Sequence, residues 1–352
     1  MSHRMMIENP NVSDREKRMI TYIMVKYNLK VVSTFKVRGA YKVVTDNGTV
    51  CLKHIKHGFR KTINGNWLIE NLMKKNFKNV AKFFKTKAGE SYVKYNKYTF
   101  YVTEWIDGIE CNLENQDEAV NCVTLLANFH NVVRILGTNT LKIDNNLKNW
   151  PKIFSKNIVE LERFKNIIDK KRIKNQFDII YLKYIDSFYE RGINALNILN
   201  NSNYYELSHI ANTNKTLCHD SFYYNNIIKR GNEYFIIDLD NIIIDLQVID
   251  LGKFIRRLMF RNNYKWEFQK AKYMIEAYMH VNPLTYAELE VMLALIIFPH
   301  KFWRLGKKRY IKQKNWDEDK YTRKLEKTIK YNDLEQKFLQ DYLNYISNMR
   351  NL

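Results

Sequence analysis

Proline, glycine and long apolar runs are scarce in this chain. Its 352 residues include 4 prolines and 11 glycines, which excludes collagen-like or Pro/Gly-rich low-complexity sequence and argues against a flexible array of small domains. No run reaches the roughly 18 consecutive apolar residues of a membrane-spanning helix. Because the first ten residues also lack the apolar core of a secretion signal, we expect synthesis and folding in the cytoplasm, with no membrane span.

Cysteine is equally sparse, and the four that occur do not cluster. They are Cys51, Cys111, Cys122 and Cys218, and none shows C-x-x-C spacing. A structural zinc site needs clustered ligands, so none is expected. The thiols are expected to stay reduced.

The rest of the composition indicates a strongly basic protein with a large core. Hydrophobic residues make up 45% of the chain, enough for one large domain or two lobes, and the formal net charge is +21. Lysine and arginine are spread along the sequence, with the densest runs at 170–174 and 307–314. This distribution favours a solvated basic surface. Nucleic-acid binding is the weakest alternative, because no nucleic-acid motif accompanies the charge.

Periodic patterns divide the chain into a strand-rich beginning and a helical remainder. Up to residue 105 they predict helices at 15–27 and 66–75, and strands at 30–33, 34–44, 49–55, 85–95 and 98–104. Asp46, Asn47 and Gly48 give a strong hairpin-turn signal. Further on, helices are predicted at 118–136, 153–174, 178–202, 250–261, 266–280, 286–301 and 321–352, interrupted by one short hairpin.

This order predicts an α+β fold with two lobes. Residues 1–105 would form a small β-rich lobe with a sheet and one helix, and 106–352 a larger helical lobe that carries a catalytic-type loop. The segment 103–108 would join them. A ligand cleft is expected where two lobes meet.

A polar loop in the second half carries residues suited to phosphate chemistry. Residues 217–228 precede an apolar run that ends in Asp238 and Asp240. A carboxylate at a strand end can hold Mg²⁺ while the metal keeps waters and phosphate oxygens, and Asn226 could add an amide oxygen. A hairpin with its tip at 230–232 would bring Asn226 and Asp238 to the same end. The alternatives are a turn asparagine and a pair of capping acids.

Lys53 is the second candidate, because it lies mid-strand among Val50, Leu52 and Ile55. A lysine in such surroundings needs an anionic partner or a route to solvent. Glu70, on the following helix, is the expected partner. Such a pair would orient the lysine toward the α- and β-phosphates of a nucleotide. The alternative is an exposed lysine on an edge strand.

Taken together, these segments resemble the aminoglycoside phosphotransferase and choline kinase branch of the protein-kinase-like fold. Within that branch the chain is similar to the CotS family of bacterial spore-coat proteins. The resemblance covers nearly the whole chain. It rests on the order and spacing of short segments at 50–53, 67–70, 77–80, 103–108, 219–226, 237–240, 250–251 and 298–303.

The resemblance implies a spore-coat component, made in the mother cell during sporulation, deposited on the spore coat and contacting other coat proteins. It also implies a site for ATP and Mg²⁺, with a small hydroxylated molecule as acceptor if the protein is active. The site residues that it implies are Lys53 and Glu70 for the phosphates, Glu104 and Ile106 at the hinge for the nucleotide, and Asn226 and Asp238 for the metal.

The loop departs from the pattern of this branch, which is His-x-Asp-x-x-x-x-Asn with the Asp accepting the proton of the acceptor hydroxyl. If His219 and Asn226 match, the Asp position holds Ser221. If Asp220 is the base, the His position falls on a cysteine and the matching asparagine is followed by another asparagine. We favour the first register, since Asn226 then precedes an apolar pair. Serine is too weakly basic for this role, so turnover would fall by a factor on the order of 10²–10⁴, unless Asp220 swings inward.

The nucleotide loop at 36–41 is also atypical, because Gly39 is its single glycine. A loop with several glycines approaches phosphates closely through its N–H groups, and here Arg38 could add positive charge instead. Three interpretations therefore stay open: a degenerate or weakly active kinase-like coat protein, an active ATP–Mg²⁺-dependent small-molecule phosphotransferase, and a basic nucleic-acid-binding protein.

Overall fold

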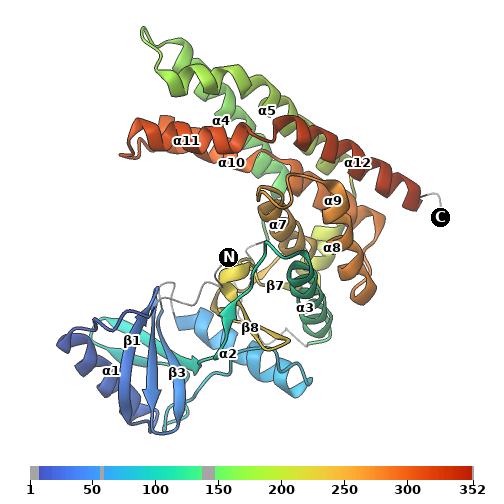
Figure 1. The fold of residues 1–352 in the computed structure, drawn as a ribbon. Coiled ribbons are helices and arrows are strands. Elements are labelled where there is room, and N and C mark those ends of the chain that lie inside the picture. The colour runs from blue at the N-terminus through green and yellow to red at the C-terminus, as the bar shows by residue number, and fades with distance from the viewer. Residues whose placement is uncertain (1–7, 56–58, 137–146, 351–352) are drawn as a thin grey trace. The chain divides into compact units, whose positions relative to one another are not determined.

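The protein was analysed as a computed structural model, which describes residues 8–55, 59–136 and 147–350 (Figure 1). The chain forms two compact units, residues 1–146 with 214–244 and residues 147–213 with 245–352. The expected lobe boundary at residue 105 stays a prediction. The compact units do not follow it, because segments on both sides of residue 105 belong to the first unit.

The first unit is built on a five-stranded antiparallel sheet. Its strands are β1 (Val31–Val37), β2 (Ala40–Thr45), β3 (Gly48–His54), β4 (Val93–Tyr95) and β5 (Tyr98–Glu104), in the spatial order β1-β2-β3-β5-β4. The predicted turn joins β2 to β3, where Gly48 adopts a φ of +100° that glycine tolerates best. The predicted break between residues 33 and 34 is wrong. Strand β1 continues to Val37, and the chain turns at Arg38 and Gly39.

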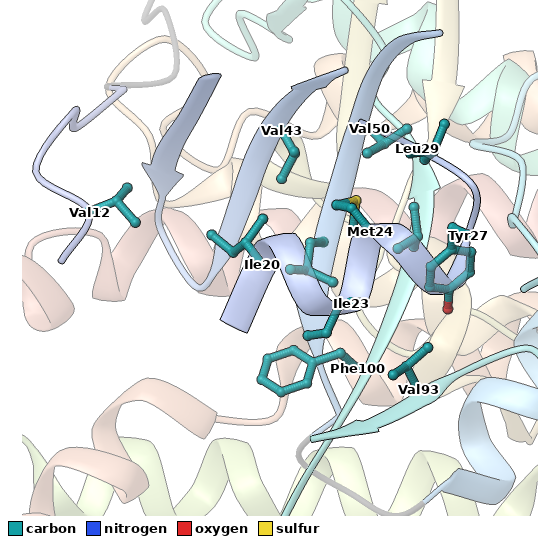
Figure 2. Close-up of a cluster of buried hydrophobic side chains, with 12 residues drawn as sticks. Val12, Ile20, Ile23, Met24, Tyr27, Leu29, Val43, Val50, Val93 and Phe100 are labelled. Carbon is teal, nitrogen blue, oxygen red and sulfur yellow. The ribbon is translucent and has the colours of Figure 1, made fainter. Parts of the chain in front are cut away.

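Helix α1 (Asp14–Lys26) packs its apolar side against this sheet. Ser13 caps the helix by accepting from an N–H of its first turn. Ile20, Ile23 and Met24 are fully buried, and each such side chain contributes about 1.5–3 kcal/mol by leaving water. Figure 2 shows them in one cluster with sheet residues that include Val43, Val50 and Phe100.

The remaining elements of the first unit include the polar loop and the segments around it. They are α2 (Phe59–Lys74), β6 (Ile109–Glu110), α3 (Gln116–Arg134), β7 (Leu217–Cys218), β8 (Ile227–Arg230), β9 (Glu233–Ile236), β10 (Ile243–Ile244) and the 3₁₀ turns η2 (Tyr224–Asn226) and η3 (Leu239–Asn241). Strands β6, β8 and β9 form one antiparallel sheet, and β7 pairs with β10. The predicted β8–β9 hairpin is confirmed, with Gly231 at its tip at a φ of +60°.

The second unit is helical. Its elements are α4 (Trp150–Asp169), α5 (Gln176–Asn201), α6 (Tyr204–Thr213), α7 (Val248–Met259), α8 (Phe268–Val281), α9 (Tyr286–Ile297), α10 (His300–Gly306), the π-helical turn η4 (Lys307–Ile311), α11 (Glu318–Ile329) and α12 (Asn332–Arg350). The predicted helix at 286–301 divides at Phe298 and Pro299, which separate the end of α9 at Ile297 from the start of α10 at His300. The predicted helix at 321–352 divides into α11 and α12, and α6 was not predicted.

Stacked aromatic rings hold the centre of the second unit. The ring of Phe302 lies between those of Tyr181 and Phe188, with centroids 4.1 Å away on each side. Arg191 and Glu335 form an ion pair whose side chains are 3% and 4% exposed. Within the described ranges, no helix has both the length and the apolar character required to cross a membrane.

Candidate functional site

A cavity of about 390 Å³ opens within the first unit, between the β1–β2 turn, β3 and the end of β5 on one side and the loops that flank β8 and β9 on the other. Its lining includes most of the site residues that the sequence predicts, namely Lys53, Glu104, Ile106, Ser221, Asn226 and Asp238. His219, Asp220 and Glu70 do not line it. The cavity therefore brings together residues that are up to 185 positions apart in the sequence.

Lys53 and Asp238 form an ion pair inside this cavity. The side chains are 26% and 32% exposed, so solvent screens the pair only in part. Burial favours the neutral lysine, but the charges of Asp238 and Asp240 outweigh it and raise the pKa of Lys53. The lysine therefore stays charged among the apolar residues of β3.

Asp238 and Asp240 share a hydrogen bond and ionise unequally. For Asp238, burial opposes ionisation, but the hydrogen bond from Asp240 and the charge of Lys53 lower its pKa below the usual range. For Asp240, burial and the hydrogen bond to Asp238 raise the pKa to about 6. The hydroxyl of Tyr101, on β5, donates to Asp240 Oδ2 at 3.0 Å and holds this second carboxyl in place.

Helix α2 approaches η3, the turn that follows Asp238, through Gly65, whereas Glu70 was the α2 residue expected near Lys53. A Cβ on Gly65 would lie 2.8 Å from the carbonyl oxygen of Leu239, so only glycine allows this approach without displacing the backbone. The predicted pairing of Lys53 with Glu70 is wrong. Glu70 instead binds Lys85 at 2.7 Å, outside the cavity lining, because the rotation of α2 turns Ile69 toward the cavity.

The loop after β7 is fastened to the strand that ends at Asp238. His219 is buried, and its Nε2 donates to the carbonyl of Ile237 at 3.1 Å, while its Nδ1 accepts from the N–H of Ser221. These partners assign the ring proton to Nε2. His219 therefore positions the loop and does not face the cavity.

Ser221 and Asn226 both line the cavity, and they are linked to each other. Asn226 Nδ2 donates to the carbonyl oxygen of Ser221 at 3.0 Å, and its Oδ1 accepts from Asn225 at 3.2 Å. The N–H of Ile237 also donates to the carbonyl oxygen of Asn226 at 3.0 Å. This geometry confirms that the hairpin brings Asn226 and Asp238 to the same end.

Asp220 precedes Ser221 in the loop but does not line the cavity. Its φ of +62° is in the left-handed region, as is the φ of +69° at Asp238. Aspartate tolerates this conformation better than most residues. The two positive φ values mark the sharp bends that place Ser221 and the Asp238 carboxylate at the cavity.

The join between β5 and β6 lines another part of the cavity with Glu104 and Ile106. The N–H of Glu104 donates to Lys82 at 2.7 Å and that of Trp105 to Thr49 at 3.3 Å. In the described part of the chain, the N–H of Ile106 donates to no backbone carbonyl.

The β1–β2 turn closes over the cavity with its charge already compensated. Arg38 lies at the tip with a φ of +55° and forms an ion pair with Glu110, a buried residue of β6. Glu110 offsets the positive charge that Arg38 was expected to offer to phosphates. The turn would therefore present a bound phosphate with Gly39 and with an arginine whose charge Glu110 already offsets.

Sequence reasoning missed Gly65 and Tyr101, and it noted Asp240 beside Asp238 without giving it a role of its own. The spacing of Asp240 two residues after Asp238 was visible, and both acids face one cavity because η3 is a tight turn. No sequence signal marks Tyr101 or Gly65, since their roles depend on contacts across more than 130 positions in each case.

The cavity suits a nucleotide with a divalent cation. Asn226 and Asp238 offer the oxygen ligands that Mg²⁺ prefers, and Lys53 offers a cation for phosphates. Apolar side chains, among them Ile106 and Ile228, supply flat walls for a base. No group of three or more His, Cys, Asp or Glu in the described part of the chain could hold a metal. A Mg²⁺ ion here would complete its shell with waters and phosphate oxygens.

Comparisons with known proteins identify the family and the fold of this chain. A family described as "Spore coat putative kinase YutH" matches residues 20–342. Spore coat protein S of Bacillus subtilis (strain 168) is 24% identical over 333 residues, which cover 93% of this chain and 94% of that protein.

Solved structures show the same fold. An aminoglycoside phosphotransferase from Alicyclobacillus acidocaldarius has a TM-score of 0.84 at 18% identity, covering 93% of this chain and 96% of that one. An amicoumacin kinase in complex with AMP-PNP and Ca²⁺ has a TM-score of 0.58 at 11% identity, covering 87% and 88%. The predicted α+β kinase-like fold is therefore confirmed, as is the predicted similarity to spore-coat proteins.

Proposed function

The chain belongs to the spore-coat family of kinase-like proteins, and from this premise we propose that its cavity binds a nucleoside triphosphate with Mg²⁺ but transfers the phosphoryl group slowly. The observation that supports the proposal is the composition of the cavity. Lys53, Asn226 and Asp238 line it together, while Ser221 occupies the place where a carboxylate base would be expected. The phosphate half of the site is thus better equipped than the acceptor half.

Each residue has a distinct role in this proposal. Lys53 binds the phosphates, Asn226 and Asp238 hold the metal, and the N–H of Ile106 donates to the base. Bound Mg²⁺ supplies charge neutralisation on the phosphoryl oxygens. Because Lys53 and Asp238 already form an ion pair, a bound nucleotide and metal would redistribute that pair, so that each charge meets a ligand of opposite sign.

Ser221 sets the limit on turnover. Phosphoryl transfer depends mainly on positioning and charge stabilisation, so a missing base slows it without abolishing it. A hydroxyl cannot accept the acceptor's proton near neutral pH, which costs a factor on the order of 10²–10⁴. His219 cannot replace the base, because it does not line the cavity and its unprotonated nitrogen, Nδ1, already accepts from the N–H of Ser221.

The alternative is a fully active small-molecule phosphotransferase with Asp220 as the base. It is supported by the position of Asp220 directly before Ser221 and by the complete phosphate half of the site. It requires the loop to move, since Asp220 lies outside the cavity lining. Fast ATP turnover that Asp220→Asn abolishes would favour this alternative.

We further propose that the protein is made in the mother cell, is deposited on the coat and contacts other coat proteins there. The match to spore-coat families over most of the chain supports this. Immunogold labelling of purified spores would test it. Label confined to the cytoplasm of the mother cell would contradict it.

A calorimetric and thermal-shift titration with ATP and Mg²⁺ tests the nucleotide site. Wild type should be stabilised, by about 2.7 kcal/mol when the ligand is at 100 times its Kd, and EDTA should reduce the effect. Asp238→Ala should lose most of it. Asp169→Ala, at an exposed aspartate that ends α4 in the second unit, is the matched control and should behave as wild type. No shift in wild type, or an equal shift in Asp238→Ala, would disprove the site.

A further inference from the structure

Positive charge is concentrated in one short part of the second unit. Residues 304–324, which run from α10 through η4 into α11, contain nine lysines and arginines and three aspartates and glutamates. Their net charge of +6 is more than a quarter of the +21 carried by the whole chain. This local excess is larger than an evenly spread basic surface would give.

The cations in this stretch crowd one another. Burial lowers the pKa of Lys308, and the like charges of Arg304, Lys314, Lys324 and Lys312 lower it further. None of these five side chains has an ion pair with a carboxylate of a described residue. Crowding of this kind raises the free energy of the unbound surface, so an anion placed among them would be favoured.

Other cations in residues 304–324 do pair with carboxylates, which distinguishes them from these five side chains. Lys307 binds Glu160 at 2.9 Å, and Arg309 binds Glu318 at 2.6 Å. Asp317 accepts from the N–H of Lys320 as the cap of α11. Most of the local acids are therefore engaged elsewhere, and the cluster faces outward without compensation.

A tryptophan lies at the centre of the cluster. The ammonium groups of Lys308, Lys320 and Lys324 lie 5.0, 5.1 and 5.3 Å from the ring centroid of Trp316. The ring is half-buried and packs against Tyr321, with centroids 5.1 Å apart. A large aromatic side chain with a polar rim is the usual composition of a protein-binding anchor.

The backbone under the cluster is firmly held. Tyr321 donates its hydroxyl to the carbonyl oxygens of Lys308 and Lys314 at 3.2 and 2.8 Å. The N–H of Lys312 donates to Lys307 across the π-helical turn, and that of Lys314 donates to Lys308. Binding would therefore cost little ordering of the main chain.

We propose that this surface docks an acidic segment of another protein. The Trp316 cluster comprises Trp316 with Arg304, Lys308, Lys312, Lys314, Lys320 and Lys324. Carboxylates of the partner meet the lysines, and an apolar side chain beside them meets the tryptophan. An acidic polypeptide is favoured over nucleic acid because three of the cations, Lys308, Lys320 and Lys324, lie within 5.3 Å of one aromatic ring instead of following a groove along which a phosphate backbone could run. The proposal goes beyond the nucleotide site and does not depend on it.

Fluorescence anisotropy with a labelled poly-L-glutamate of about 20 residues tests the proposal on the full chain. Parallel titrations use a duplex oligonucleotide of equal charge and vesicles that contain phosphatidylserine. Wild type should bind poly-L-glutamate at low salt and more tightly than either other probe. Lys312→Glu/Lys314→Glu/Lys324→Glu should weaken this binding at least tenfold, since three favourable pairs become repulsive.

The matched control is Lys152→Glu/Lys156→Glu/Lys337→Glu, which changes the net charge equally at exposed lysines elsewhere in the second unit. It should weaken binding less than threefold, and both triple variants should retain the wild-type circular dichroism spectrum. Equal losses in the two variants would show that net charge alone attracts the probe and would overturn the proposal. Tighter binding of the oligonucleotide or the vesicles, lost in the first variant, would reassign the surface to that class of partner.

Discussion

The unequal ionisation of Asp238 and Asp240 leads to a stability measurement that can be worked out in advance. The pKa of Asp240 rises from 3.8 to about 6 on folding, because of burial and its hydrogen bond to Asp238. A carboxyl with a raised pKa stabilises the folded state while it is protonated. That stabilisation is complete below the unfolded pKa and is lost as the pH rises through the folded pKa. Asp240→Asn removes this titration but keeps the size and polarity of the side chain.

The size of the effect follows from the pKa difference. A shift from 3.8 to about 6 corresponds to about 3 kcal/mol in all, at about 1.4 kcal/mol per unit. About half of that, roughly 1.4 kcal/mol, is lost between pH 5 and pH 8. Asp238 does not interfere in this window, since its pKa is lowered and it is ionised throughout.

Urea unfolding of wild type and Asp240→Asn at pH 5, 6, 7 and 8 measures this difference. The free energy of unfolding of wild type should fall relative to the variant by about 1.4 kcal/mol across the series, and most of the fall should come between pH 5 and about pH 6, where the profile levels off. Other titrating groups cancel, because both proteins contain them. Parallel pH profiles would refute the assignment of a shared proton to Asp240, and so would a difference that grows with opposite sign.

The remaining predictions concern contacts inside the first unit or inside the second. Tyr101→Phe removes the hydroxyl that lowers the pKa of Asp240, so the same pH profile should level off at a higher pH than that of wild type; an unchanged profile would contradict it. Gly65→Ala places a Cβ 2.8 Å from a backbone oxygen of η3. It should lower the free energy of unfolding by about 1–2 kcal/mol after the gain in helix propensity is subtracted. An unchanged free energy of unfolding in urea would argue against the close approach. Arg191→Met leaves the buried Glu335 without its partner and should cost about 3–5 kcal/mol where the lone carboxyl is ionised. Burial raises the pKa of Glu335 to about 7 even beside Arg191, so urea unfolding should show a smaller loss at pH 6 than at pH 9.

Local sequence signals were sufficient to predict that Asn226 and Asp238 lie at the same end of a hairpin. The hairpin between Asn226 and Asp238 could be predicted because Gly231 marks its tip and the strands on each side are adjacent in the chain. Likewise Gly48 located the β2–β3 turn. In each case the decisive interaction joins residues close in sequence, where turn chemistry and strand pairing are coupled.

Contacts between distant elements could not be predicted in the same way. Glu70 was assigned to Lys53 by analogy of position, but the rotation of α2 decides which side chain faces the cavity. Its apolar residues extend around more than one side, so the pattern leaves that rotation undetermined. The two-residue strand β6 pairs with β8, more than 100 positions later in the chain, yet such a short strand has no periodic signal.

Counting ADP release from ATP and Mg²⁺ tests the central claim most directly, because it records transfer to any acceptor, including water. The claim is that the phosphate half of the cavity is functional and that Ser221 limits turnover. Wild type should release ADP slowly, and Ser221→Asp should raise the rate by a factor on the order of 10² or more. Asp238→Ala should abolish release in both backgrounds. Fast release in wild type, or no gain in Ser221→Asp while nucleotide binding is intact, would contradict the claim.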